Sequence, residues 1–248
     1  MKAGRIFIAA GCVLLAAALC LTLYNVWDNT RAADKAEETL RQLSQITDII
    51  KVPEKHVPTV SAAEKEKPQS TETSDEPSEA ENSESVSEET SYIETESEKE
   101  KVYPDYVLDP SMKMPVLELD GINYIGIVEL PTLGVTLPII EEWSESNLKS
   151  SPCRYAGSVY RSDLVIAGHN YRSHFGSLSG LSYGDSVRFT DMDGNLFVYK
   201  VIEIETLDAY ANDAMMSGKC DLTLFTCNFS GKKRVTVRCE LTEEYPNV

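Results

Sequence analysis

Residues 221–241 read DLTLFTCNFSGKKRVTVRCEL, and this stretch decides the fold class. Strands are predicted at 222–227 and 234–241, because both alternate apolar and polar residues and favour β-branched or aromatic side chains. The residues between them, 228–233, contain Ser-Gly and predict a hairpin connection. A regular strand pair of this kind is typical of a mainly β domain.

Strand alternation places one cysteine and one arginine next to each other. Side chains on a strand point alternately to opposite faces, so Leu222 and Leu224 share the core face and Cys227 points outward. On the return strand Arg234 also points outward beside Cys227, and Arg238 follows about 13 Å further down. A thiol next to a guanidinium suggests a nucleophile with an oxyanion donor. The alternative is a buried, unreactive thiol, because cysteine is among the most buried residue types.

A histidine lies at the end of a second apolar run. Residues 163–169 read DLVIAGH and predict a strand that leaves the sheet through Gly168 and His169. The chain has three histidines, of which His56 lies in a polar segment and His174 in the loop beyond. His169 is therefore the best placed partner for the thiol, which needs a nearby base to become a thiolate. A structural histidine bonded to backbone is the alternative.

Other elements follow from the same patterns. Additional strands are predicted at 122–130, 135–140, 187–190 and 196–204. Short helical segments are predicted at 174–181 and 209–218, and a polar loop at 143–151.

At this point the stretch 122–241 resembles a sortase, the cysteine transpeptidase family of Gram-positive cell surfaces. The resemblance rests on LVIAGHN at 164–170, TLFTC at 223–227 and the first arginine of RVTVR at 234–238. The segment 122–140 resembles the opening strands of the family and is less specific.

The resemblance implies a closed β-barrel of about eight strands with short helices. It implies that His169, Cys227 and Arg234 are catalytic, and that Thr226 lies at the substrate groove. It further implies that the enzyme cleaves an LPxTG-like sorting signal on secreted proteins through a Cys thioester. The acyl group then passes to an amine of a peptidoglycan precursor or a pilin. No cofactor is implied.

Two alternatives use the same barrel. A cysteine peptidase would release the acyl-enzyme to water with the same three residues, and a non-catalytic barrel on a stalk would only bind surface ligands. The pilin-polymerising branch of the family is less favoured, because we see no apolar helix after Leu241 and no lid-like segment before the barrel.

The N-terminal region predicts a membrane anchor. Residues 6–27 are mostly apolar and long enough to cross a bilayer. Lys2 and Arg5 precede this run, which favours a cytoplasmic N-terminus at 1–5 and a catalytic domain outside the cell. A cleaved signal peptide is the competing interpretation.

Two further segments separate this anchor from the barrel. Residues 28–51 predict a juxtamembrane helix, because Leu40, Leu43 and Ile46 recur at helical spacing; it is either a solvated stalk or a partner-binding face. Residues 52–101 are rich in Ser, Glu and Thr and predict a disordered acidic linker. The catalytic domain is then expected at 102–248.

Composition excludes two classes of function. The net charge is −17 and no basic patch with interleaved aromatic residues occurs, so nucleic acid is not expected as a partner. The six cysteines show no C-x-x-C spacing near a histidine pair, so no metal site is predicted. Cys220 and Cys239 lie on neighbouring strands, and a disulfide between them is left open.

Overall fold

The computed structural model describes residues 2–46, 103–217, 220–228 and 230–245. The predicted acidic linker at 52–101, and residues 47–51 of the predicted juxtamembrane helix, lie outside the described residues.

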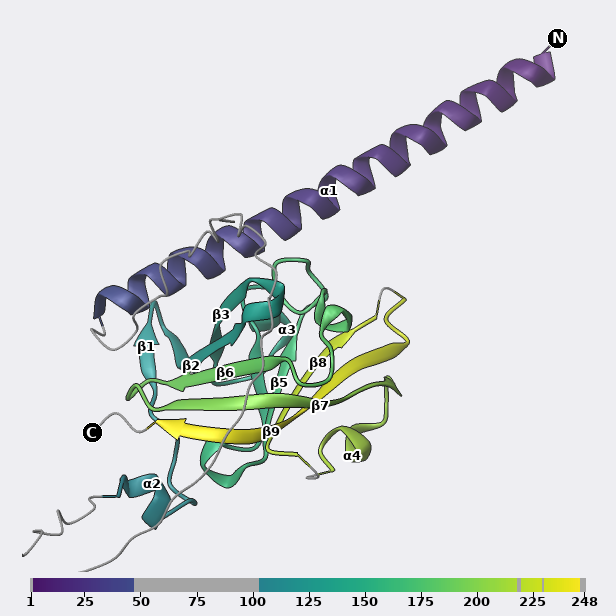
Figure 1. The fold of residues 1–248 in the computed structure, drawn as a ribbon. Coiled ribbons are helices and arrows are strands. Elements are labelled where there is room, and N and C mark those ends of the chain that lie inside the picture. Colours follow the sequence, from purple (N-terminus) through teal and green to yellow (C-terminus); the bar gives the residue numbers. More distant parts are fainter. Residues whose placement is uncertain (1, 47–102, 218–219, 229, 246–248) are drawn as a thin grey trace, which may run out of the picture. The chain divides into compact units, whose positions relative to one another are not determined.

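Residues 103–245 fold around a closed β-barrel (Figure 1). The sheet has the strand order β1-β2-β3-β4-β5-β8-β9-β7-β6, and β6 pairs back with β2, so that eight strands close and β1 is added beside β2. The pairs β3–β4 and β5–β8 are parallel and the others are antiparallel. The predicted barrel of about eight strands is confirmed. The strands are β1 Leu117–Leu119, β2 Ile122–Leu130, β3 Val135–Ile140, β4 Cys153–Ala156, β5 Leu164–Gly168, β6 Ser186–Asp191, β7 Leu196–Asp208, β8 Leu222–Cys227 and β9 Lys233–Tyr245.

The helices of this part of the chain are short. The strand β4 and the helix α3 occur where the sequence predicted no regular element, and the Ser144 hydroxyl caps α3 by accepting a bond from the Asn147 amide at 3.0 Å. The helix predicted at 174–181 is a turn followed by a single 3-10 turn. The helical elements are α2 Asp105–Leu108, η1 Pro131–Leu133, α3 Glu145–Leu148, η2 Val159–Arg161, η3 Leu178–Gly180 and α4 Asn212–Met215.

The barrel interior is filled by the face that alternation predicted. Leu222, Leu224, Val237 and Cys239 are each fully buried in the main core. Strand alternation therefore identified the core side of the β8–β9 hairpin correctly.

The opposite face of the hairpin is not exposed, contrary to the sequence interpretation. Phe225 is buried with Val165, Ala167 and Met215, and Tyr155 packs against this cluster. Met215 belongs to α4, so the connection that directly precedes the hairpin folds back over what alternation alone described as an outward face.

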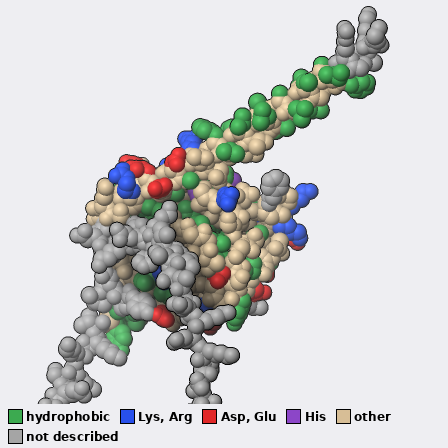
Figure 2. All heavy atoms as spheres, turned by 45° about the horizontal axis from the view of Figure 1, so that its top comes forward, with side chains coloured by type: hydrophobic (Ala, Val, Ile, Leu, Met, Phe, Trp, Pro, Cys, Tyr) green, Lys and Arg blue, Asp and Glu red, His purple; other side chains and the backbone are tan. Residues whose placement is uncertain are grey.

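The helix α1 (Lys2–Ile46) is continuous across the boundary predicted at 27 and 28. It is the one helix among the described residues that is long and apolar enough to cross a membrane. At 1.5 Å per residue its 45 residues extend about 68 Å, more than twice the thickness of a bilayer core. Figure 2 shows hydrophobic side chains gathered along its N-terminal part.

The second half of α1 packs against the barrel. Ala32, Ala36 and Leu43 are buried, and Leu43 lies in a small cluster with Tyr124 and Ile140. Positions 32, 36, 39 and 43 recur at helical spacing, so they form one face. The sequence left two interpretations of this helix open, a solvated stalk or a partner-binding face. In the structure the face contacts the barrel.

Candidate active site

Three neighbouring strands bring the predicted site residues to one end of the barrel. β5 and β8 are parallel, with Gly168 opposite Thr226, so His169 and Cys227 follow at the same edge of the sheet. β8 and β9 are antiparallel, with Cys227 opposite Arg234. The predicted pairing of Cys227 with Arg234 is confirmed. All three residues line one cavity of about 480 Å³.

One wall of the cavity is aromatic. The ring of Tyr155 meets Trp143 edge-on at 6.1 Å and Phe225 edge-on at 5.3 Å between ring centroids. Such an array gives a rigid apolar surface next to the polar end that carries Cys227. The remaining lining residues come from α3, from the end of β5 and the loop after it, from α4 and the connection before it, and from the β8–β9 loop: Glu145, Leu148, Ala167, Gly168, Asn170, Ala209, Asn212, Met215, Asn228 and Gly231.

Arg234 is held by its own hairpin loop. Its Nη1 donates to the carbonyl oxygens of Gly231 at 3.0 Å and Lys233 at 3.2 Å. Because Gly231 adopts a φ of 72°, in the left-handed region that favours glycine, the loop can turn its carbonyl toward the arginine. The guanidinium thus has a fixed position in the cavity wall, beside Cys227.

The cysteines differ in their surroundings. Cys227 is partly exposed at the cavity, whereas Cys153 and Cys239 are fully buried. Burial raises the pKa of the Cys153 thiol to about 12 and raises the pKa of Cys239 further, so both stay protonated at neutral pH. Cys220 and Cys239 are free thiols in this structure.

His169 is half-buried in the cavity wall. Burial lowers the pKa of its imidazole, and the negative charge of Asp28 partly opposes that effect. The ring of Tyr171 stacks on the imidazole, with centroids 3.8 Å apart and planes inclined by 20°. The imidazole is therefore constrained on one face by an aromatic ring.

His174, which the sequence placed in a loop, is fully buried behind His169. Burial lowers its pKa to about 4, and the nearby His169 lowers it as well. In the unfolded chain the His174 imidazole binds a proton at about pH 6.5, whereas in the folded chain it does so only at about pH 4. Between these two pH values the unfolded chain therefore binds more protons than the folded chain. The stability present above this window is therefore lost as the pH falls through it.

We expect His174→Gln to flatten this dependence. The wild-type chain should lose about 3 kcal/mol more stability between pH 7 and 4 than the variant, as measured by urea unfolding in detergent. His56→Gln, in the predicted linker, is the matched control and should unfold like the wild type at every pH. Equal slopes for His174→Gln and the wild type would contradict the role of His174.

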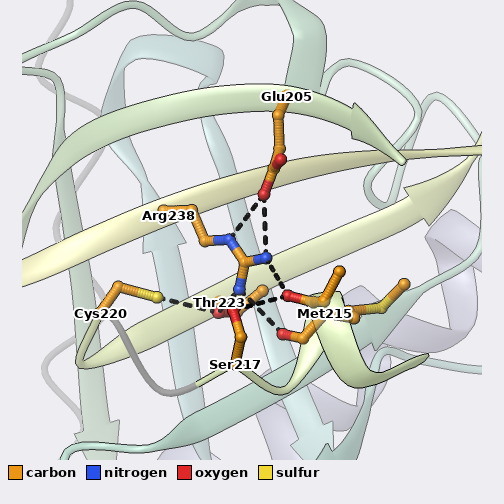
Figure 3. A network of polar contacts seen from close by, with 7 residues as sticks. Glu205, Met215, Ser217, Cys220, Thr223 and Arg238 are labelled. Atoms are coloured by element: carbon orange, nitrogen blue, oxygen red, sulfur yellow. Dashed lines mark hydrogen bonds and ion pairs between the residues drawn. The ribbon is translucent and has the colours of Figure 1, made fainter. Parts of the chain in front are cut away.

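Arg238 is buried, although strand alternation placed it on the outward face of the hairpin. It is 5% exposed and forms an ion pair with Glu205 at 2.9 Å. Its Nη1 donates to the Met215 carbonyl at 2.8 Å and its Nη2 to the Ala214 carbonyl at 2.5 Å (Figure 3). Arg238 therefore binds the C-terminal end of α4.

A hydroxyl, from Thr223, and a thiol, from Cys220, complete this network. Thr223 lies opposite Arg238 in the hairpin, and its hydroxyl accepts a hydrogen bond from the Arg238 Nη1 at 3.2 Å. The Cys220 sulfur lies 3.2 Å from the same hydroxyl (Figure 3). α4 carries Asn212 and Met215, which line the cavity. The network thus holds one cavity wall from behind.

Thr226 points to the barrel side of β8. It is 3% exposed, is absent from the cavity lining, and its hydroxyl has no hydrogen-bond partner among the described residues. Its predicted role at the substrate groove stays a prediction.

The aromatic wall and α3 were not predicted from the sequence. Trp143 and Tyr155 lie in segments without a clear periodic pattern, and β4 is only four residues long. A local signal did exist for α3, since Ser144 followed by Glu145 is a favourable helix start.

Comparison with known proteins agrees with the fold. Residues 128–242 match a family model described as "Sortase domain". No curated protein matches the chain.

Several solved structures are similar to this chain. Sortase C of Streptococcus pneumoniae is 22% identical with a TM-score of 0.46, over 52% of this chain and 71% of that one. Sortase A of Listeria monocytogenes is 23% identical with a TM-score of 0.44, over 49% and 88% of the two chains. Sortase E1 of Streptomyces coelicolor is 24% identical with a TM-score of 0.43, over 50% and 90%.

Proposed function

Residues 128–242 of this chain form a sortase domain, and from this premise we propose that the protein is a cysteine transpeptidase acting on a sorting signal. The observation that carries the proposal is the convergence of Cys227, His169 and Arg234 on one cavity, each from the end of a different neighbouring strand.

In the proposed reaction the Cys227 thiolate attacks the carbonyl carbon of the scissile peptide bond. Arg234, whose Nη1 is already held by two loop carbonyls, stabilises the negative oxygen that forms. His169 donates a proton to the departing amine, and a thioester to Cys227 remains. An incoming amine then gives up a proton to His169 and attacks the thioester, which forms the new amide, breaks the carbon–sulfur bond and frees the Cys227 thiolate.

The proposed substrate is an LPxTG-like signal on a secreted protein. The aromatic array of Trp143, Tyr155 and Phe225 suits apolar side chains of the signal, which would pack there while the scissile bond lies at Cys227. The proposed acceptor is an amine of a peptidoglycan precursor or of a pilin.

The decisive experiment offers the full chain, in detergent micelles, a library of LPxTG-like peptides with candidate amines. Intact mass should show a covalent adduct on Cys227 when the amine is omitted, and the peptide–amine product when it is present. Release of free acid even at saturating amine would favour the peptidase instead. Absence of any adduct with every peptide would remove the proposal in favour of a non-catalytic barrel.

We also propose that residues 6–27 of α1 anchor the chain in the cell membrane, with residues 1–5 in the cytoplasm and the barrel outside. The length and apolar composition of α1, and the basic residues before the apolar run, support this. Protease added to intact protoplasts should then remove the barrel. If the barrel survived until the membrane was broken, the orientation would be the opposite of the one proposed.

A further inference from the structure

The loop that carries His169 is bound to α1 directly after the proposed membrane segment. The Tyr171 hydroxyl donates a hydrogen bond to the Asp28 carboxylate, and the Tyr171 ring stacks on His169 at 3.8 Å. Asp28, Tyr171 and His169 therefore form a continuous line of contacts from the helix to the cavity.

A second set of contacts joins the same two elements. The Ser173 hydroxyl donates to the Asn29 carbonyl at 3.3 Å, and the Ser173 amide lies 3.4 Å from the Asn29 side-chain oxygen. Behind them His174 is fully buried and meets Tyr171 edge-on at 5.4 Å. Because two neighbouring polar residues of α1 each bind a different residue of the loop, the loop is held in one place on the helix.

The bond between Tyr171 and Asp28 has a defined donor. Burial raises the pKa of Tyr171 far above its usual range, and the bond to Asp28 raises it as well. The hydroxyl therefore stays protonated at any physiological pH, and its bond to an ionised carboxylate is of the strong, charge-assisted kind. This bond fixes the height and tilt of the tyrosine ring.

We propose that Asp28 and Tyr171 are positioning residues for the His169 imidazole. α1 holds Tyr171 through Asp28, and the stacked tyrosine ring fixes the plane of the imidazole at the cavity. The inference rests on the proposed transpeptidase function, in which His169 must transfer protons at both the departing and the incoming amine. Proton transfer needs correct distance and angle, and a small displacement can lower the rate by about a hundredfold.

Charged and titratable groups from several elements face His169. They are Asp28 on α1, Glu145 and Lys149 at α3, His174 on its own loop, and Cys227 and Arg234 across the cavity. Asp28 and Glu145 favour the protonated imidazole, whereas burial and Lys149 disfavour it. Replacement of Asp28 by a neutral residue should therefore move the pKa of His169 to lower values.

The test is a double-mutant cycle on the full chain in detergent, with Asp28→Asn, Tyr171→Phe and the double variant. Each single variant should lower kcat about tenfold and leave KM for the signal peptide unchanged. The double variant should lose no more than a single one, because both changes break the same line of contacts. Asp34→Asn on the exposed side of α1 and Tyr183→Phe, 81% exposed, are matched controls that should keep wild-type kcat.

A second measurement requires no substrate. NMR titration of the histidine rings should show a lower pKa for His169 in Asp28→Asn, with the signal of His56 unchanged as an internal reference. Three results would overturn the positioning role. They are an unchanged kcat in both single variants, a loss of kcat in the double variant equal to the product of the two single losses, and losses of kcat that follow the fall in melting temperature alone. If the wild-type chain cleaves no peptide, the proposed function fails. The NMR titration still tests the positioning role in that case, because an unshifted pKa of His169 in Asp28→Asn would overturn it.

Discussion

Replacement of Cys227 by alanine should abolish cleavage of the signal peptide, with a loss of about 10⁴-fold or more. Cys227 is the one cysteine among the described residues that lines the cavity, where it lies opposite Arg234. No other side chain there could form the thioester in its place. Intact mass after incubation with peptide alone should show an adduct on the wild-type chain and none on the variant.

Two buried cysteines provide matched controls. Cys153→Ala and Cys239→Ala each remove a fully buried thiol that burial keeps protonated, so most activity should remain. Both should lower the melting temperature slightly, because they leave a small cavity. An equal loss of turnover in all three variants would mean that Cys227 has a structural role instead.

The second large effect should come from Arg234. Arg234→Lys keeps the positive charge but loses the planar fork, which here binds loop carbonyls and also faces the cavity. Loss of one oxyanion donor typically lowers turnover about 10²–10³-fold. We expect a loss of that order in kcat at saturating peptide, with an unchanged melting temperature.

Arg238→Lys is the matched control. Arg238 is 5% exposed and binds Glu205 and two carbonyls of α4. A lysine cannot reach all of these acceptors, so about 2 kcal/mol of stability should be lost. KM should rise, because the cavity wall at Asn212 and Met215 loosens, while kcat should change little.

These two variants separate a chemical role from a structural one. If Arg238→Lys lost turnover and Arg234→Lys lost only stability, the roles assigned from the strand register would be exchanged.

Much of the fold was predictable because its signals are local. Strands β2, β3 and β8 begin and end at the residues predicted from the pattern of apolar and turn-forming residues. β4 was missed because four residues are too few to show a period, and α3 because its segment is polar. The convergence of His169 with Cys227 depends on parallel pairing of β5 with β8, which no local pattern encodes. The sequence named His169 as the partner of Cys227 because the other two histidines lie in a polar segment and a loop, and the resemblance to a family pointed to the same residue.

By itself the sequence determined which side chains share a strand face and which residues oppose each other across the hairpin. Both follow from covalent geometry and from turn residues close in the chain, and so Cys227 lies opposite Arg234. Only the tertiary structure decided what covers each face. The outward side of β9 is buried at Arg238 because α4 lies on it, and His169 is stacked because Asp28 of α1 holds Tyr171. Burial depends on segments that meet only when the barrel has closed, which alternation along one strand cannot report.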